Sequence, residues 1–348
     1  MPLDDLLASA LGTRAPAADA GAGTAEAPPA AAVAAEAAAQ LEALLDAAPT
    51  IVPATAQRVT TFISSLLDSV TGDEPAGGRA NAASSGAAAE RGTLSRETSR
   101  RLQASVERLA AAAIPTDPSE LANGTSALVL SSSQLNITSI ATSDPEELTA
   151  QPVTCASAYE APIAISLPNA LLSGVSGFNA SLPVVALLYT TEAQLHAPVI
   201  DGYGAAADRG GNDADVSSSA RQPRPASPMV SFSLLQDGSA LRVRGAADAI
   251  NVSVPLSIAT AGGGACVADA SGALLARGCD ATLECRWWDK RDGNGSWVTS
   301  GCTTIRGDGG VTCSCDHLTD FIVFELCAAR QPPEAVPSRQ PPEAVPRS

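Results

Sequence analysis

Apolar residues in the first third of the chain recur every three to four positions, which is the spacing of amphipathic helices. Three such stripes predict three helices within residues 28–115. Pro49 and Pro115 end the first and third, because proline cannot continue the hydrogen bonding of a helix, and Thr55 is a suitable N-cap for the second. The stripes consist of Val33, Ala37, Leu41, Leu44, Leu45 and Ala48; of Val59, Phe62, Ile63, Leu66 and Val70; and of Leu102, Val106, Leu109 and Ala113. We therefore expect a helical subdomain at 28–115, after a segment, 1–27, whose lack of periodicity predicts disorder.

After residue 120 the pattern changes to short runs rich in Val, Ile, Leu, Ser and Thr, bounded by Gly, Pro and Asn. Such runs are typical of strands. The candidate strands are 126–131, 135–142, 161–167, 183–190, 229–235, 240–244 and 249–257. This series predicts a β-sandwich over residues 120–326 and therefore an α+β fold for the chain as a whole.

Two polar segments do not fit the strand pattern. Residues 204–228 combine a Gly-Gly-Asn-Asp sequence with prolines and arginines, which predicts a disordered, solvent-exposed insertion. The sequence Arg-Gln-Pro-Pro-Glu-Ala-Val-Pro occurs at 330–337 and again at 339–346, which predicts an extended, Pro-rich tail over 327–348.

Acidic residues outnumber basic ones by 37 to 21, and the formal net charge is −16. Such a charge repels the phosphate backbone, so we do not expect a nucleic acid as a partner. No uncharged apolar run in the sequence approaches the roughly 18 to 20 residues that a membrane-spanning helix requires, so we expect no transmembrane segment in this chain.

Asparagines followed by x-Ser or x-Thr are more frequent than chance predicts, since five of the eight asparagines are in such sequons. We expect N-glycosylation at Asn123, Asn136, Asn179, Asn251 and Asn294. Six of the eight cysteines fall between positions 266 and 315, which indicates a cross-linked module. Both features predict an extracellular or cell-surface location. The acidic start of the chain does not look like a secretory signal, so we expect the N-terminus to be incomplete or wrongly assigned.

The most specific pattern of the sequence lies at residues 285–326. In order, it reads Cys285-Arg286-Trp287-Trp288-Asp289, Gly295-Ser296-Trp297, Gly301-Cys302 and Cys313-Ser314-Cys315-Asp316-His317-Leu318-Thr319-Asp320-Phe321. Each piece alone is weak, but the ordered set with its spacing resembles the GPS motif. This motif forms the C-terminal part of the GAIN domain in adhesion-type G-protein-coupled receptors and polycystin-like proteins. The resemblance implies a small helical subdomain followed by a disulfide-stapled β-sandwich.

Proteins with a GPS motif are known for self-cleavage, which the resemblance places between Leu318 and Thr319. His317 would act as the base and Thr319 as the nucleophile, in a single-turnover reaction that needs no cofactor and does not make the protein a turnover enzyme. Asp316 stands where the family often has Asn, and we expect a carboxylate beside the imidazole to raise the pKa of His317. The alternative is an intact turn between two strands, in a non-cleaving, glycosylated spacer domain.

The resemblance also implies the disulfides Cys285–Cys313 and Cys302–Cys315. The spacing of Cys266 and Cys279 suggests a further hairpin bridge, while Cys155 and Cys327 are left either paired or free. A zinc site is the competing interpretation of this region, although we expect no metal. Its ligands would be Cys302, Cys313, Cys315 and His317. We expect the following aromatic residues to pack in the core: Trp287, Trp288, Trp297 and Phe321.

Residues 319–326 have high β-propensity, so we expect this segment to remain bound as a strand after cleavage. The two pieces would then form a non-covalent complex. In adhesion receptors the equivalent segment is a tethered agonist, but Glu325 stands here where that segment usually carries an apolar residue. The expected role is cell-surface adhesion or signalling within a larger receptor or polycystin-type channel. The outside partner would be an unidentified extracellular protein or matrix ligand.

Overall fold

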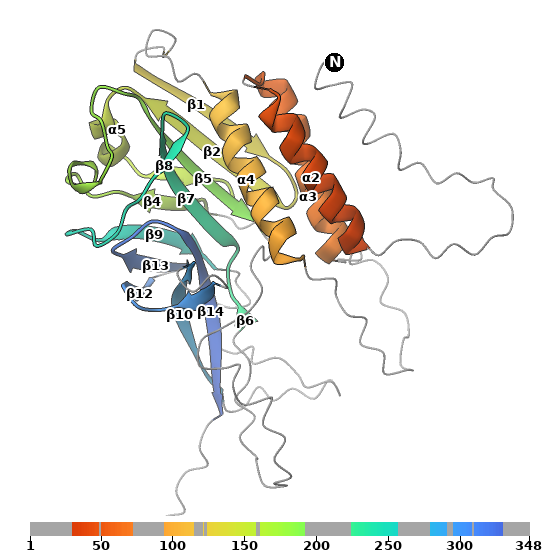
Figure 1. Ribbon diagram of the computed structural model, residues 1–348. Coiled ribbons are helices and arrows are strands. Elements are labelled where there is room, and N and C mark those ends of the chain that lie inside the picture. Colours follow the sequence, from red (N-terminus) through yellow and green to blue (C-terminus); the bar gives the residue numbers. More distant parts are fainter. Residues whose placement is uncertain are drawn as a thin grey trace, which may run out of the picture.

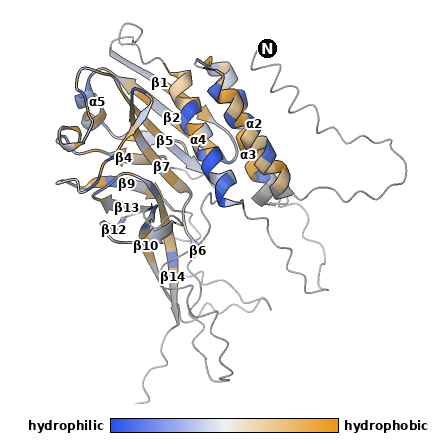
Figure 2. Ribbon diagram, viewed as in Figure 1, coloured by the Kyte–Doolittle hydropathy of each residue, from blue (hydrophilic) through white to orange (hydrophobic). Residues whose placement is uncertain are grey.

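Three helices lie side by side and cover one face of a large antiparallel sheet (Figure 1). They are α2 (Ala30–Asp46), α3 (Pro53–Thr71) and α4 (Arg96–Ala113). The computed structural model describes residues 30–48, 50–71, 94–114, 121, 124–157, 161–191, 224–256, 279–290, 295–307 and 310–329. Ser95 caps α4, since its hydroxyl oxygen accepts a hydrogen bond from the backbone N–H of Thr98 at 3.1 Å. Figure 2 shows hydrophilic residues along α4, whose other side packs on the sheet.

The strands of the described residues form two antiparallel sheets. The first sheet has the order β1-β2-β5-β7-β14-β10-β11, with β6 beside β14 and β8 beside β7. Its strands are β1 (Thr125–Ser131), β2 (Leu135–Thr142), β5 (Val184–Thr191), β6 (Arg224–Pro225), β7 (Met229–Gln236), β8 (Ser239–Leu241), β10 (Cys279–Asp289), β11 (Ser296–Val298) and β14 (Asp320–Ala329).

The second sheet has the order β12-β13-β9-β4-β3. Its strands are β3 (Val153–Cys155), β4 (Ile163–Ser166), β9 (Ile250–Pro255), β12 (Cys302–Gly307) and β13 (Gly310–Cys315). A short helix, α5 (Pro145–Ala150), follows β2, and a 3-10 turn, η2 (Leu172–Gly174), follows β4. The molecule is thus an α+β fold in which a helical layer is followed by two sheets.

Two hydrophobic cores hold the three layers together. One lies between the helices and the first sheet, and the other lies between the two sheets. Successive residues of β14 contribute to the two cores in turn, as the period of two in a strand requires. Ile322 and Phe324 belong to the core under the helices, whereas Phe321 and Val323 belong to the core between the sheets. All four side chains are at most 1% exposed, so β14 is buried on both faces.

The predicted helices and strands are present, but three boundaries differ. The insertion predicted at 204–228 extends too far, because residues 224–228 are ordered against β14 and Ala226 is buried. Likewise, the tail predicted from 327 begins later, since β14 continues to Ala329 opposite the start of β10. Helix α3 begins at Pro53 rather than at Thr55, because proline is tolerated in the first turn of a helix. The segments 1–27, 204–223 and 330–348 lie outside the described residues.

Candidate functional site

The turn between β13 and β14 carries the residues that the sequence singles out for chemistry. It spans residues 316–319 and crosses from the second sheet to the first. Asp316 exchanges two backbone hydrogen bonds with its surroundings, from its N–H to the carbonyl of Gly301 at 3.0 Å and from the N–H of Ala246 to its own carbonyl at 2.8 Å. The N–H of Leu318 donates to the carbonyl of Val243 at 3.3 Å. The backbone on the N-terminal side of the Leu318–Thr319 bond is therefore fixed.

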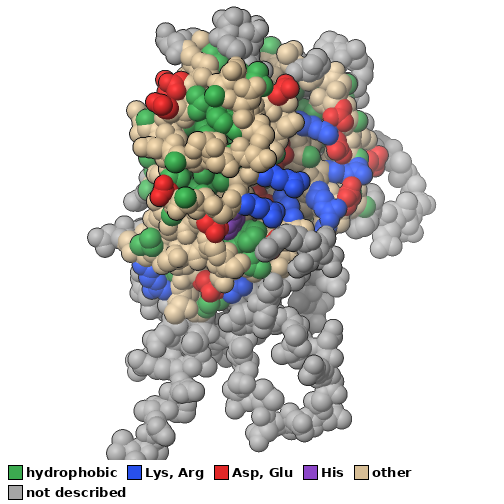
Figure 3. Space-filling model, turned by 60° about the vertical axis from the view of Figure 1, so that its left-hand side comes forward, with side chains coloured by type: hydrophobic (Ala, Val, Ile, Leu, Met, Phe, Trp, Pro, Cys, Tyr) green, Lys and Arg blue, Asp and Glu red, His purple; other side chains and the backbone are tan. Residues whose placement is uncertain are grey.

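His317 is buried in this turn, with about 7% of its side chain exposed. Nδ1 lies 2.7 Å from Oδ1 of Asp316, and the ring of Trp287 covers the imidazole with a centroid distance of 4.0 Å. Nε2 is buried and has no hydrogen-bond partner among the described residues. An ionised carboxylate can only accept a hydrogen bond, so the Nδ1 that faces Asp316 carries the hydrogen and Nε2 keeps its lone pair. Figure 3 shows only a small purple area of histidine beside basic and hydrophobic side chains.

Burial lowers the pKa of His317 below its ordinary value of 6.5. The hydrogen bond and the charge of Asp316 act in the opposite direction but are the smaller effects, and Arg244 lowers the pKa further. Asp316 thus raises the pKa of His317 as expected, but the net shift is downward because desolvation of the imidazolium outweighs the neighbouring carboxylate. At neutral pH the ring is uncharged, which is the state that can accept a proton.

Thr319 lies next to the ring in sequence, and its hydroxyl donates to the carbonyl oxygen of Trp288 at 3.2 Å. The carbonyl of Thr319 accepts from the N–H of Phe232 at 3.3 Å. His317, Leu318 and Thr319 all line a partly open pocket of about 340 Å³. The side chains of His317 and Thr319 and the Leu318–Thr319 bond therefore lie at one pocket that is partly open to water.

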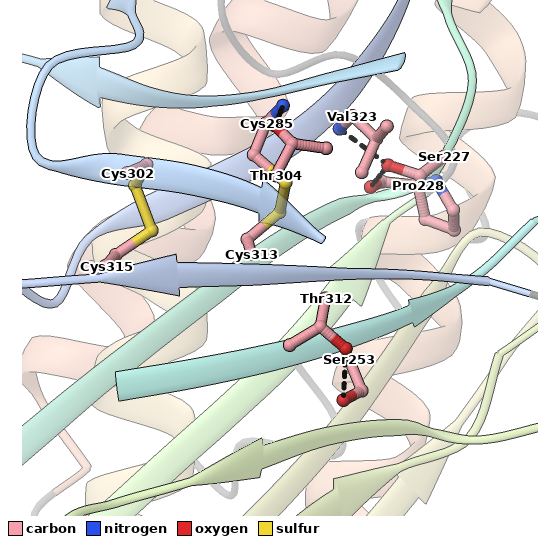
Figure 4. The surroundings of a disulfide bond; sticks show 10 residues. All are labelled: Ser227, Pro228, Ser253, Cys285, Cys302, Thr304, Thr312, Cys313, Cys315 and Val323. Carbon is pink, nitrogen blue, oxygen red and sulfur yellow. Dashed lines mark hydrogen bonds between the residues drawn. A yellow bond between two sulfur atoms is a disulfide. The ribbon is translucent and has the colours of Figure 1, made fainter. Parts of the chain in front are cut away.

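Two disulfides cross-link the strand that leads into the turn to neighbouring strands (Figure 4). Cys285–Cys313 joins β10 to β13 and so links the two sheets, with Cα atoms 5.6 Å apart. Cys302–Cys315 joins directly opposite residues of β12 and β13. These are the pairings that the resemblance implies. They engage the three cysteines of the zinc alternative, so that set of ligands does not exist in this structure.

The aromatic residues expected in the core are divided between several places. Trp288 and Trp297 are buried under the helices, where their rings meet edge to face at 5.2 Å. Phe321 is fully buried between the sheets. Trp287 is only partly buried, because it forms a wall of the pocket over His317, and its indole N–H donates to the carbonyl of Ser300 at 2.6 Å.

Of the remaining predicted residues, the four whose side chains the structure describes do not line this pocket. Asn179 is exposed, whereas Asn136 and Asn251 are partly buried in strands β2 and β9. Cys155 is buried and forms no disulfide within the described part of the chain. The following lie outside the described residues: Asn123, Asn294, Cys266 and the side chains of Cys279 and Cys327.

The sequence pattern did not indicate the polar residues that surround the start of β14. Asp320 is buried and contacts Ser231 of β7, Gln103 of α4 and Lys290 after β10. These contacts join segments up to 217 residues apart, so no local pattern could have revealed them. The one available indication was an acidic residue at the start of an otherwise apolar strand.

Comparison with protein families identifies the chain. The family model described as "GPS: GAIN subdomain B" matches residues 136–324, which is more than half of the chain. The chain belongs to this family. The second sheet, the two disulfides and the turn at 316–319 fall within the matched residues, as does most of the first sheet, whereas strand β1 and the helices α2 to α4 precede them.

Similar proteins include two adhesion receptors. The chain is 49% identical over 43 residues to adhesion G protein-coupled receptor E5 of Bos taurus, and 49% identical over 39 residues to adhesion G protein-coupled receptor G3 of Mus musculus. The alignments span 12% and 11% of this chain but only 6% and 7% of the receptors. The solved full extracellular region of zebrafish Gpr126/Adgrg6 matches with a TM-score of 0.43 and 12% identity, over 83% of this chain and 33% of that one.

The chain is thus a GAIN/GPS module of the kind found in adhesion receptors. GPS domains are typically autoproteolytic and are not turnover enzymes. No helix in the described part of the chain has both the length and the apolar character needed to cross a bilayer.

Proposed function

We propose that this GAIN/GPS module cleaves itself once, between Leu318 and Thr319, and remains a complex of two non-covalently associated pieces. The observation that carries the proposal is the state of His317. Its Nδ1 is engaged by Asp316, its Nε2 is buried with no hydrogen-bond partner in the part of the chain that the structure describes, and burial lowers its pKa, which favours the neutral ring. A neutral imidazole with a free lone pair, two residues from a threonine, is suited to take the proton of a hydroxyl.

In the first step, the Thr319 oxygen attacks the carbonyl carbon of Leu318 while its proton moves to Nε2 of His317. The resulting tetrahedral intermediate collapses when the bond to the Thr319 nitrogen breaks and this nitrogen takes the proton back from the imidazole. The acyl group has then moved from nitrogen to oxygen. Water hydrolyses the ester, which leaves a Leu318 carboxylate and a new N-terminal Thr319 with its hydroxyl restored.

The resting hydroxyl of Thr319 donates to the carbonyl of Trp288, not to the imidazole. Attack therefore requires rotation of the threonine side chain away from this carbonyl. Catalytic hydrogen bonds are often longer or differently aligned before the reaction, so the resting geometry is compatible with cleavage. The same hydrogen bond is also the observation that favours the second candidate function, a non-cleaving, glycosylated spacer in which Thr319 is a structural residue.

Retention of the C-terminal piece follows from the position of β14. The strand pairs with β10 from Phe321 to Ala329 and with β7 and β6 on its other side. Burial of four large apolar side chains contributes roughly 6 to 12 kcal/mol at about 1.5 to 3 kcal/mol each. The backbone hydrogen bonds to two neighbours add to this, so cutting the chain before β14 does not release the strand.

We place the module outside the cell, as part of a larger adhesion-type receptor or polycystin-type channel. The disulfides and the sequons support an oxidising, secretory route. The partners we propose are the module's own cleaved strand and an extracellular protein or matrix ligand. Neither a nucleic acid nor a cofactor enters the proposal.

The test is secretion of the chain from eukaryotic cells behind an added signal sequence, followed by intact mass measurement under denaturing conditions. Wild type should give two fragments whose masses correspond to a break before Thr319, and Thr319→Ala should give one uncut chain. Thr303→Ala, at an exposed position of β12, is the matched control and should be cut like wild type. An uncut wild-type chain would refute self-cleavage and leave the spacer function.

A further inference from the structure

A cluster of polar side chains lies just C-terminal to the Leu318–Thr319 bond, around the start of β14. Its centre is Asp320, the first residue of β14, which is 4% exposed. The hydroxyl of Ser231 donates to Oδ1 at 2.5 Å, and the side-chain amide of Gln103 donates to Oδ2 at 3.3 Å. The ammonium of Lys290 lies 3.8 Å from the same Oδ2. A sheet strand, a helix and the segment after β10 thus all hold one carboxylate.

A buried carboxylate stabilises a fold only where its partners replace the water that it loses. The strand that follows, from Phe321 to Phe324, is apolar and fully buried, so the acid is not needed for packing. Other titratable groups face the same place. Burial raises the pKa of Glu107 of α4 and raises that of Tyr189 of β5 well above its ordinary value, and the charge of Asp320 contributes to both shifts. Keeping these titratable groups buried together therefore costs stability, so we look for the role of the cluster outside the stability of the fold.

The same segments that hold Asp320 also hold Thr319. The carbonyl of Trp288 accepts the Thr319 hydroxyl, and Lys290, two residues later, pairs with Asp320 and lines the pocket of the site. On the other side, the hydroxyl of Ser231 binds Asp320, and the N–H of Phe232 binds the carbonyl of Thr319. The position of Asp320 and the position of the nucleophile are thus set by one pair of segments.

We propose that Asp320 is a positioning residue of the self-cleavage and that Gln103 of α4 acts through it. The turn 316–318 is fixed by backbone hydrogen bonds, but the Cα atom that carries the nucleophile is fixed only if the chain after it is fixed too. Asp320 supplies this anchor on the C-terminal side. Because misplacement of reacting atoms by about 1 Å costs up to about 100-fold in rate, a loosened anchor slows attack without unfolding the protein. The helical layer thereby takes part in cleavage through one named contact. This inference rests on the proposed function.

The test compares cleavage rates in pulse-chase experiments on the secreted chain. Gln103→Leu keeps the size of the side chain but removes the amide, and it should slow cleavage about tenfold, the order of one hydrogen bond to a charged group. Gln103→Glu should slow it further, because it places a second carboxylate against Asp320. Leu102→Ala is the matched control for lost stability, since it removes a fully buried side chain of the same helix without touching the cluster.

A double exchange provides the rescue. Asp320→Asn alone should slow cleavage, but together with Gln103→Glu it restores an amide-to-carboxylate hydrogen bond in the reverse direction and should cleave faster than Gln103→Glu alone. Melting temperatures, measured for each variant in an uncleavable Thr319→Ala background, separate rate from stability. The Leu102→Ala variant should melt lowest and yet cleave faster than Gln103→Leu.

The results that overturn the inference are specific. If wild type is cut but Gln103→Leu and Gln103→Glu are cut at the wild-type rate, the anchor does not exist. If the rates of all variants simply follow their melting temperatures and the double exchange gives no rescue, the cluster is structural only. If the wild-type chain itself stays uncut, the proposed function fails and the positioning role fails with it.

Discussion

Gly301 controls the geometry of Asp316, and its replacement by alanine should slow cleavage. Gly301 has a φ of +79°, and a Cβ atom placed on it would lie 2.6 Å from Oδ1 of Asp316. Ordinary contacts begin near 3.4 Å, so the carboxylate oxygen must retreat by about 0.8 Å. This oxygen is the one that binds Nδ1 of His317 at 2.7 Å. Gly301→Ala therefore disturbs the base without touching it.

The size of the effect follows from the lost hydrogen bond. Hydrogen bonds to charged groups contribute about 1.5 to 3 kcal/mol, and the lower end applies because the side chain of Asp316 is 52% exposed. About 1.4 kcal/mol corresponds to a tenfold change in rate, so we expect Gly301→Ala to be cut about ten times more slowly. Asp316→Asn keeps an acceptor for Nδ1 and should be affected less.

The matched control is Gly238→Ala in the turn between β7 and β8. Gly238 has a φ of +68° and no atom within 4 Å of its added Cβ, so this variant bears the cost of a left-handed alanine, about 1 kcal/mol, without a clash. In urea unfolding of an uncleavable background, both variants should bear the cost of a left-handed alanine, and Gly301→Ala should lose about 1.5 kcal/mol more through the disturbed hydrogen bond. Only Gly301→Ala should be slow in pulse-chase analysis of cleavage. Equal cleavage rates for the two would refute the role assigned to the Asp316–His317 contact.

Four further outcomes are expected. Glu107→Gln should raise the melting temperature at pH 7 more than at pH 4. Burial raises the pKa of Glu107 above 4.5, so the folded protein loses stability as the pH rises and this side chain ionises, and glutamine removes that loss. Phe324→Ala, at a fully buried position, should reduce the free energy of unfolding by about 3 to 5 kcal/mol in urea titrations and weaken retention of the cleaved strand. Serine at both Cys285 and Cys313, which close a 28-residue separation, should cost about 3.5 kcal/mol in the same titration. The cleavage rate should fall at acidic pH with a midpoint below 6.5, because the pKa of His317 is lowered; a midpoint above 6.5 would contradict this shift.

Local patterns were sufficient for most of the architecture. The stripe of Leu102, Val106 and Leu109 is buried in α4 as its spacing predicts. In α2, Leu41 and Leu45 are buried as the stripe predicts, but its first half is displaced by one residue, since Ala34 and Ala38 are buried while Val33 and Ala37 are only partly so. In a helix that is mostly alanine, adjacent faces differ little in hydrophobicity, and the packing against α4 decides which face is buried.

Short pairings were not visible in the sequence. The two-residue strand β6 has no run of apolar residues. Its order comes from pairing with β14 and from the next residue, Ala226, whose N–H donates to the carbonyl of Val323 at 2.8 Å. The polar sequence around it therefore predicted an exposed insertion. A segment whose order depends on one distant strand carries no periodicity of its own, so the end of such an insertion cannot be derived from composition.

The chemistry of the turn shows the same division between local and distant causes. Sequence places Asp316 beside His317, and this neighbour alone would raise the pKa of the imidazole. What reverses the shift is burial, to which Trp287 contributes, a residue 30 positions earlier that β10 brings over the ring. The direction matters for function, because a raised pKa would leave the imidazole partly charged at neutral pH and unable to accept a proton. In the proposed cleavage, a neutral base at the pH of the secretory pathway therefore depends on the packing of the first sheet against the turn, so the rate of cleavage should depend on completion of the fold.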